Sequence, residues 1–161
     1  MRGTYTLVLV CDEGFGVVMG RLGRVWVGAG CCLYTGSALG VGAQSLEGRV
    51  ERHVRRWKRR RWHVDYLTSN QHCRVTRVVW LISPRRLECA INRAVAEELN
   101  ARPVLAGAGS SDCECDAHLL RVQSSVGVRG VVRGLVRVYG RFGGRVRLMR
   151  FASSSRTFGE G

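Results

Sequence analysis

Lysine and acidic residues are scarce in this chain of 161 residues. Lys58 is the single lysine, so arginine supplies 25 of the 26 basic side chains, against 12 acidic ones. The formal net charge of +14 and the isoelectric point near 10.9 exclude an acidic surface overall and favour a polyanionic partner. Arginine binds phosphate bidentately, which suits nucleic acid, although a GC-rich coding sequence would enrich arginine without a functional cause.

Long apolar runs are also missing. No stretch approaches the ~20 apolar residues of a membrane span, and the N-terminus lacks the charged and apolar regions of a signal peptide. We therefore expect a cytoplasmic protein with no membrane partner. An odd number of cysteines argues against a full disulfide framework in a reducing compartment, and most of them are predicted to be small buried hydrophobes. The seven are Cys11, Cys31, Cys32, Cys73, Cys89, Cys113 and Cys115.

Short runs of β-branched and aromatic residues, separated by glycine, dominate the first part of the chain. With 45% hydrophobic residues, a chain of this length can bury one substantial core. The runs predict an antiparallel meander, and the helical patterns after it place the fold in the α+β class, as a small mostly antiparallel sheet flanked by helices. The predicted strands cover residues 3–10, 17–19, 25–27, 32–34, 75–82 and 118–122.

A basic amphipathic helix is predicted over residues 45–61. Apolar or aromatic side chains recur there at helical spacing, at Leu46, Val50, His53, Val54 and Trp57. Arginines fill the remaining positions, and a helix with so basic a face is suited to the phosphate backbone of a nucleic acid. The arginines assigned to this contact are Arg52, Arg55, Arg56, Arg59 and Arg60.

A second helix is predicted over residues 85–99, with Ser83 and Pro84 at its start. The composition shifts after Val122, because no acidic residue occurs again until Glu160. Residues 1–122 are therefore predicted to form the domain, and residues 123–161 a basic extension rich in glycine, valine and arginine. Its arginines recur every four residues, as on a helix, yet valine and glycine are weak helix formers, so helix and strand both stay open. Residues 153–161 are predicted to be disordered.

Several polar motifs occur in a fixed order along the chain. Gly3-Thr4-Tyr5 is followed by Tyr34-Thr35-Gly36, where the glycine is predicted to form a tight turn, and then by Arg49 and His53 one helical turn apart. The blocks Trp62-His63-Val64-Asp65-Tyr66-Leu67 and Gly109-Ser110-Ser111-Asp112-Cys113-Glu114-Cys115-Asp116-Ala117-His118-Leu119 flank Glu88. In this order the motifs resemble the GIY-YIG nuclease superfamily over about residues 3–120. The closest likeness is to a largely archaeal branch sometimes joined to endonuclease III-like proteins.

The resemblance implies a GIY-YIG-like fold and a metal-dependent endonuclease that hydrolyses phosphodiester bonds in DNA, with repair as one setting. The two tyrosine motifs, at Tyr5 and Tyr34, are further apart than in typical members, so residues 14–30 are expected to form an inserted β-hairpin. The resemblance assigns one divalent ion, Mg²⁺ or Mn²⁺, to Glu88. Mg²⁺ keeps several waters, so one carboxylate from the protein is chemically sufficient.

The catalytic residues implied by the resemblance divide between charge stabilisation and proton transfer. Arg49 would grip the scissile phosphate with His53 beside it, while Tyr5 or Tyr34 would activate water if neighbouring charge lowered the phenol pKa. His63 would serve as a second base or as a phosphate ligand. Each of these catalytic residues also has a purely structural interpretation. Arg49 would lie on a solvated face, the tyrosines and histidines would pack in the core, and Glu88 would be a first-turn residue favoured by the helix dipole. The catalytic set is Tyr5, Tyr34, Arg49, His53, His63 and Glu88.

Two alternatives remain open from the sequence alone. A non-catalytic nucleic-acid-binding module would keep the fold and the basic arginines without the convergence of Glu88 and a phenol near Arg49. Separately, Cys113, Cys115 and His118, with Cys89 as a fourth, have the ligand types of a structural zinc site. Their Cys-x-Cys spacing differs from the usual Cys-x2-Cys of zinc knuckles, so packed thiols are the favoured interpretation.

Overall fold

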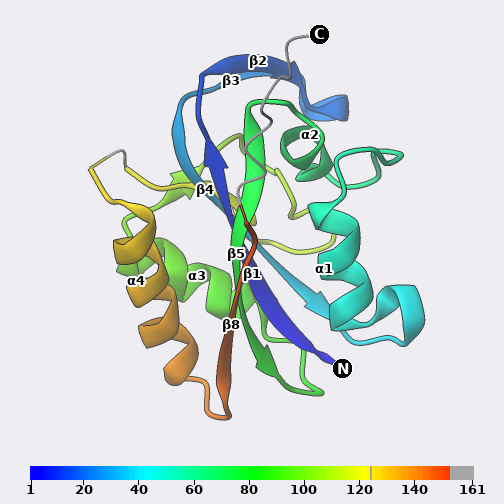
Figure 1. Cartoon of the computed structure of the whole chain (residues 1–161), viewed down its shortest axis with the longest axis vertical. Coiled ribbons are helices and arrows are strands. Elements are labelled where there is room, and N and C mark those ends of the chain that lie inside the picture. Colours follow the sequence, from blue (N-terminus) through cyan, green and yellow to red (C-terminus); the bar gives the residue numbers. More distant parts are fainter. Residues whose placement is uncertain (124, 153–161) are drawn as a thin grey trace, which may run out of the picture.

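A six-stranded antiparallel sheet forms the centre of the molecule (Figure 1). The structure is a computed structural model, and it describes residues 1–123 and 125–152. The strand order is β6 (Arg102–Pro103), β7 (Leu119–Arg121), β4 (Gly30–Ala38), β1 (Gly3–Cys11), β5 (Cys73–Ile82), β8 (Val146–Arg150). The predicted α+β class is confirmed.

The central strand β1 explains why the sheet holds together. Its run of threonine, leucine and valine is buried on both faces, and it pairs along its whole length with β4 on one side and β5 on the other. A strand covered on both faces needs a continuous apolar run rather than strict alternation. A disulfide between Cys11 and Cys73 joins the end of β1 to the start of β5, so these two cysteines are cross-linked, whereas the sequence favoured small buried hydrophobes for most of the seven.

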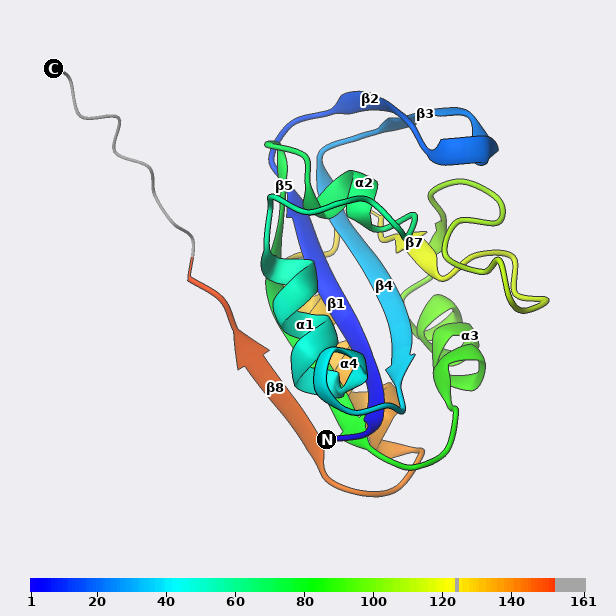
Figure 2. The same cartoon turned by 90° about the vertical axis from the view of Figure 1, so that its right-hand side faces the viewer.

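The hairpin expected over residues 14–30, between the two tyrosine motifs, is present as a separate two-stranded sheet. It consists of β2 (Phe15–Val18) and β3 (Arg24–Val27), joined by the 3-10 turn η1 (Gly20–Leu22). The hairpin lies beyond one end of the main sheet, at the top of Figure 2. Val27 and Phe15 are buried, so the insertion has its own small apolar contact with the rest of the molecule.

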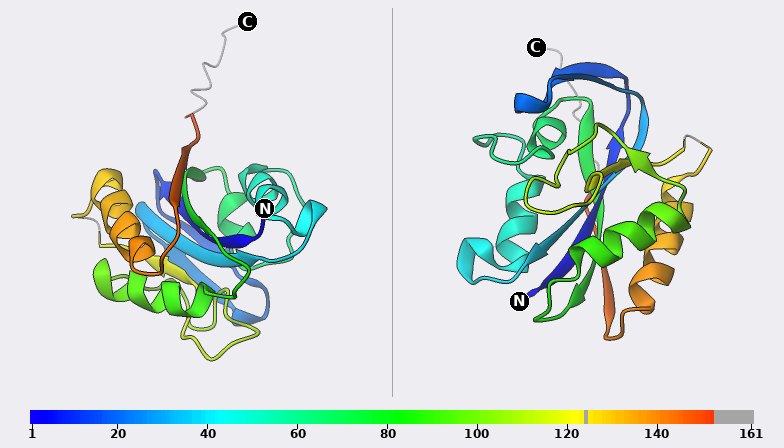
Figure 3. Two further views of the ribbon diagram at one scale, coloured as in Figure 1. Left: turned by 90° about the horizontal axis from the view of Figure 1, so that it is seen from below. Right: turned by 180° about the vertical axis from the view of Figure 1, so that it is seen from behind.

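Helices cover both faces of the main sheet. α1 (Leu46–Val54), preceded by the 3-10 turn η2 (Gly42–Gln44), and α2 (Asp65–Thr68) lie on one face, and α3 (Glu88–Glu98) and α4 (Val128–Gly140) lie on the other (Figure 3). Ser45 caps α1 by accepting a hydrogen bond from the amide of Gly48 at 3.2 Å. α3 begins three residues later than predicted, because Ser83 Oγ accepts from the amide of Arg85 in a turn and not in a helix cap.

The basic helix is shorter than the prediction of residues 45–61. α1 ends at Val54, where the ammonium group of Lys58 donates to the carbonyl oxygens of Arg52 and His53 at 3.1 and 2.9 Å. These carbonyls belong to the last turn, which has no further helix to satisfy it. The chain then leaves the helix, so Trp57, predicted on the buried face, is 87% exposed. Residues 55–61 are called the basic loop below.

The predicted extension belongs in large part to the domain itself. Val131, Leu135 and Tyr139 of α4 are fully buried, and β8 pairs with β5 from Leu81 to Arg77. The hydroxyl of Tyr139 lies 2.8 Å from Oγ1 of Thr6 in the central strand. Glycine and valine are weak helix formers in isolation, but the apolar stripe of α4 packs on the sheet and stabilises it. The predicted disorder over residues 153–161 lies outside the described residues.

The described residues contain no helix that is both long enough and apolar enough to cross a bilayer.

Adjacent residues of α4 test whether the C-terminal segment contributes to stability. Leu135 is fully buried and Val136 is 41% exposed. We expect Leu135→Ala to lower the free energy of unfolding by roughly 2–5 kcal/mol, because it leaves a cavity between helix and sheet. Val136→Ala should change it by less than about 0.5 kcal/mol. Urea denaturation of the full chain measures both, and equal effects of the two variants would mean that α4 is not part of the cooperative core.

Candidate functional site

A cavity of about 310 Å³ opens where β4 loses its neighbour β7. β7 pairs with β4 only from Cys32 to Tyr34, and the following β4 residues form the floor of the cavity. One wall comes from α1 and the segment after the basic loop, and the other comes from the start of α3 and the loop before β7. The lining side chains include Tyr34, Arg49, Arg61, Trp62, His63, Arg86, Glu88, Ser111, Asp112 and His118.

Four of the six predicted catalytic residues line this cavity. They are Tyr34, Arg49, His63 and Glu88, which come from a strand, a helix, a loop and a second helix on the opposite face of the sheet. Residues so far apart in sequence meet only because the sheet edge is open between the two walls. The other two, Tyr5 and His53, lie behind the cavity in the core and do not line it.

Arg49 has the features of an anion-binding group. Its Nη2 donates to Oε1 of Gln44 at 2.8 Å, and its guanidinium carbon lies 5.1 Å from the ring centre of Trp62. Its Nε is buried and has no hydrogen-bond partner among the described residues. A buried donor without a partner is costly, and an oxyanion in the cavity would satisfy it.

Gly36 allows the two tyrosines to approach the site, and it does so without the predicted tight turn. It lies inside β4, opposite Tyr5 in the strand register. A Cβ at this position would lie 2.9 Å from the hydroxyl oxygen of Tyr5 and 3.3 Å from Tyr34, so the glycine gives space to the phenol rings. The backbone φ of Gly36 is not in the left-handed region, so the position requires glycine because of close packing and not because of backbone conformation.

Neither phenol is prepared to act as a base at neutral pH. Burial raises the pKa of Tyr34 to about 12, and the opposing effect of Arg49 is smaller. Burial also raises the pKa of Tyr5 well above its ordinary value. Both hydroxyls are therefore protonated, and activation of water by Tyr5 or Tyr34 stays a prediction.

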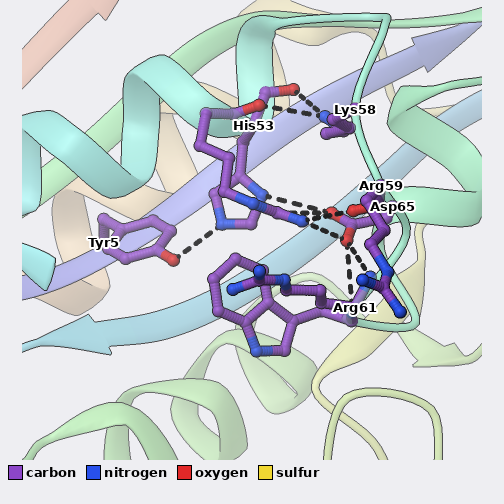
Figure 4. A network of polar contacts seen from close by, with 8 residues as sticks. Tyr5, His53, Lys58, Arg59, Arg61 and Asp65 are labelled. Atoms are coloured by element: carbon purple, nitrogen blue, oxygen red, sulfur yellow. Dashed lines mark hydrogen bonds and ion pairs between the residues drawn. The ribbon is translucent and has the colours of Figure 1, made fainter. Parts of the chain in front are cut away.

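A polar network behind the cavity is built around Asp65 (Figure 4). Asp65 is fully buried in the first turn of α2, and it accepts hydrogen bonds from both terminal nitrogens of Arg52 at 2.8 Å. Its Oδ2 also accepts from the backbone amides of Arg61 and Trp62 at 2.7 and 3.0 Å. These hydrogen bonds outweigh burial, which acts in the opposite direction, and hold the pKa of Asp65 below its ordinary value.

His53 extends this network to the central strand. Its Nε2 lies 2.9 Å from the Tyr5 hydroxyl, and its Nδ1 faces Oδ1 of Asp65 at 3.9 Å. Burial lowers the pKa of His53 to about 3, although the carboxylate of Asp65 opposes the shift. The imidazole is therefore neutral, and a proton on Nδ1 leaves Nε2 to accept from Tyr5. His53 serves to fix α1 against β1.

His63 is held in one tautomer by the opposite wall. The backbone amide of Gly109 donates to His63 Nδ1 at 2.9 Å, so in the neutral ring the proton is on Nε2. Burial lowers the pKa of His63, which favours this neutral form. Of the two roles left open by the sequence, this tautomer matches a phosphate ligand that donates a hydrogen bond better than a base.

Glu88 and Asp112 bring two carboxylates to the second wall. Glu88 is 8% exposed, in the first turn of α3, and its Oε1 lies 3.3 Å from Nε of Arg86. Arg86 also lies 3.9 Å from Asp112, and its side chain is largely exposed, so it can move away when a cation approaches. Carboxylate oxygens are the ligands that Mg²⁺ and Mn²⁺ prefer, so the residues present fit the implied ion. The sequence analysis did not assign Arg86 or Asp112 to the site. The position of Arg86 two residues before Glu88 was the signal that could have identified it.

The predicted nucleic-acid-binding arginines separate into two groups. Arg52 is used in the network, because its guanidinium binds Asp65 and the carbonyl oxygen of Arg59. Arg55, the first residue of the basic loop, pairs with Glu51 of α1 at 2.6 Å, and both side chains are exposed. The remaining three, Arg56, Arg59 and Arg60, belong to the basic loop and not to a helix face.

The pH dependence of stability tests the neutral state of His53. Its pKa is about 3 in the folded protein and ~6.5 in an unfolded chain, so the unfolded state binds the proton first as the pH falls. Protonation of His53 in the unfolded state therefore lowers the free energy of unfolding progressively between pH ~6.5 and pH ~3. The loss amounts to about 2 kcal/mol at pH 5. Denaturation at pH 7 and pH 5 should therefore show a smaller loss for His53→Gln than for the wild type. Parallel losses in the two proteins would contradict the assignment.

Comparison with known proteins identifies one family. The family described as Domain of unknown function DUF123 matches residues 4–140, which include the cavity, α4 and the main sheet except for β8 and the first residue of β1. No curated protein and no solved structure matches the chain. Because the match spans most of the sequence and ends inside the domain described above, the chain belongs to the DUF123 family.

Proposed function

We propose that this protein is a metal-dependent endonuclease that hydrolyses phosphodiester bonds in DNA. The observation that supports it most directly is the convergence of Tyr34, Arg49, His63 and Glu88 on one cavity. Their types match what phosphodiester hydrolysis needs, namely groups that bind a phosphate, donate hydrogen bonds and hold a cation.

The first wall supplies the groups for the phosphate. The Nε of Arg49, which has no hydrogen-bond partner in the part of the chain that the structure describes, and the proton on Nε2 of His63 are donors suited to non-bridging phosphate oxygens. The ring of Trp62 supports the guanidinium groups of Arg49 and Arg52, at 5.1 and 4.1 Å from its centre. Charge that develops on a phosphate in the transition state would therefore meet donors that are already in position.

The second wall supplies the groups for the metal. Glu88 would hold Mg²⁺ or Mn²⁺, with Asp112 as a neighbouring oxygen ligand on the same wall. The ion would supply positive charge against the phosphate and lower the pKa of a bound water. Displacement of Arg86 from Glu88 would accompany ion binding, because both cations compete for the same carboxylate.

The basic loop is the proposed contact for the DNA backbone beside the cavity. It presents Arg56, Arg59 and Arg60, and Arg61 at its end lines the cavity itself. Trp57 lies in the same loop and is 87% exposed, so its indole does not contribute to the packing of the core. Base stacking on an exposed aromatic contributes about 1–3 kcal/mol per base, which gives the exposed ring a use on unpaired nucleotides.

A non-catalytic DNA-binding module is the second candidate. It is favoured by the raised pKa of Tyr34 and by the ion pair between Arg86 and Glu88, which neutralises the carboxylate that an enzyme needs for its metal. The module would use the basic loop and the cavity arginines alone. The two candidates differ in whether Glu88 is required for turnover or dispensable.

Substitution of one glutamate in α3 tests the enzymatic proposal. We expect Glu88→Gln to reduce cleavage of labelled single-stranded, duplex, flapped and abasic DNA by at least about 10²-fold, since the cation loses its carboxylate. Binding affinity should change little. Glu97→Gln, an exposed acid on the same helix, is the matched control and should cleave like the wild type. The assay compares the three proteins with Mg²⁺, with Mn²⁺ and with a chelator.

The outcomes of this assay separate the two candidates. Metal-dependent cutting by the wild type and by Glu97→Gln, but not by Glu88→Gln, supports the endonuclease. Cutting that persists at full rate in Glu88→Gln removes this residue from the mechanism. Tight binding with no cutting by any of the three proteins leaves the binding module as the function.

The salt dependence of binding tests the basic loop. Each arginine that contacts a phosphate contributes about 0.9 to the slope of log K against log[salt] on duplex DNA. We expect substitution of Arg56, Arg59 and Arg60 by glutamine to lower that slope by roughly 2–3. The control carries glutamine at Arg129 and Arg133, which are exposed on α4 on the opposite face of the sheet. A slope unchanged by the loop substitutions, or lowered equally by the control, assigns the contact elsewhere.

A further inference from the structure

We infer that the protein contains a structural zinc site formed by Cys89, Cys113, Cys115 and His118. The three sulfur atoms and one imidazole nitrogen lie within 4.8 Å of one another. Tetrahedral zinc with Zn–S bonds of ~2.3 Å separates its sulfur ligands by ~3.8 Å, so the observed cluster has nearly the size of such a site. This inference stands independently of the proposed function.

The orientation of His118 supports a ligand role. Its Nδ1 donates to the backbone carbonyl oxygen of Thr35 at 3.0 Å, which leaves Nε2 without the proton. Nε2 faces the sulfur atoms of Cys113 and Cys89 at 3.5 and 3.7 Å. Histidines that bind metal commonly donate their second ring nitrogen to a carbonyl group, which fixes the tautomer and the ring plane. The buried imidazole thus directs its lone pair at the thiols.

The positions of the thiols argue against ordinary hydrophobic packing. Cys31 and Cys32 are buried in β4 among apolar side chains, as small hydrophobes are expected to be. Cys89, Cys113 and Cys115 are only half-buried, and they meet each other and a histidine. Three partly exposed thiols around an imidazole bury little apolar area, whereas the same four groups satisfy the coordination of zinc completely.

The ligands also join three separate segments of the fold. Cys89 belongs to the first turn of α3, while Cys113 and Cys115 lie in the loop between β6 and β7, which extends over residues 104–118 (Figure 2). His118 ends this loop beside β4, where its backbone oxygen accepts from the amide of Thr35 at 3.3 Å. One ion would connect helix, loop and sheet in a region with little regular structure.

The site is closed and therefore structural. Four protein ligands complete the tetrahedron, and no position is left for a substrate or a reactive water. Binding of Zn²⁺ converts three thiols to thiolates and releases three protons to solvent, with no change of oxidation state. The ion would stabilise the cavity wall that carries Glu88 and Asp112, which are sequence neighbours of Cys89 and Cys113.

Metal content of the untagged, full-length protein purified under reducing conditions tests the inference. Elemental analysis should give about one zinc per chain in the wild type, and Cys113→Ser and Cys115→Ser should each lose most of it. Cys31→Ala is the matched control, since it removes a free thiol outside the cluster, and it should keep its zinc. Zinc removed by a chelator should lower the thermal midpoint, and Co²⁺ added in its place should give the absorption bands of a tetrahedral thiolate site.

Failure of the serine variants to fold would not hide the answer, because the wild-type measurements decide it. Wild-type protein that holds no zinc and develops no thiolate band with Co²⁺ overturns the site. Iron in place of zinc, or a disulfide between two of the three cysteines in the purified chain, also overturns it. DNA cleavage plays no part in any of these readouts, so the outcome is separate from that of the Glu88→Gln experiment.

Discussion

The first wall of the cavity depends on the hydrogen bonds that the buried carboxylate of Asp65 accepts. This carboxylate binds the fork of Arg52 and two consecutive backbone amides, those of Arg61 and Trp62, so it closes the basic loop onto the end of α1. A buried carboxylate is stable only when its hydrogen-bonding capacity is filled in this way. Removal of one partner from such a pair typically costs about 3–5 kcal/mol. The position of Trp62, and through it that of Arg49, follows from this single carboxylate.

On the second wall Glu88 and Asp112 face the exposed side chain of Arg86, and the loop between β6 and β7 is held by other hydrogen bonds. One of them joins it to α3, where Nδ2 of Asn92 donates to the carbonyl oxygen of Ala117 at 2.7 Å. Residues 104–118 contain little regular structure, and they are held to the sheet by Thr35 and to the first wall by the amide of Gly109 on His63. The hydrogen bond between Gly109 and His63 is therefore a direct link between the walls. A zinc ion at the cysteine cluster would add a further constraint on this loop, since Cys113 and Cys115 belong to it. Both walls thus depend on polar groups, while the sheet beneath them depends on apolar burial.

The sequence predicted those features whose cause is local. The strand β1, the short strands between residues 14 and 30 and the α+β class follow from apolar runs and glycine spacing, and all are confirmed. The end of α1 was not predictable, because it depends on Lys58 reaching back to carbonyl groups and on Asp65 thirteen residues after Arg52. The role of α4 was missed for a similar reason. Its composition is poor for a helix, and only contact with the sheet, including Tyr139 on Thr6, stabilises it.

In the candidate site, too, the sequence indicated which residue types are present but not which role each residue takes in the fold. Motif order was sufficient to select Tyr34, Arg49, His63 and Glu88, which do line one cavity. It could not separate them from Tyr5 and His53, because burial and tautomer are set by partners distant in the chain. Arg52 is an example. In the sequence it is one basic residue among many, but in the fold its guanidinium binds Asp65 and is not free to bind phosphate. A basic pattern therefore indicates where polyanions can bind, but the carboxylates of the fold decide which arginines remain available to bind them.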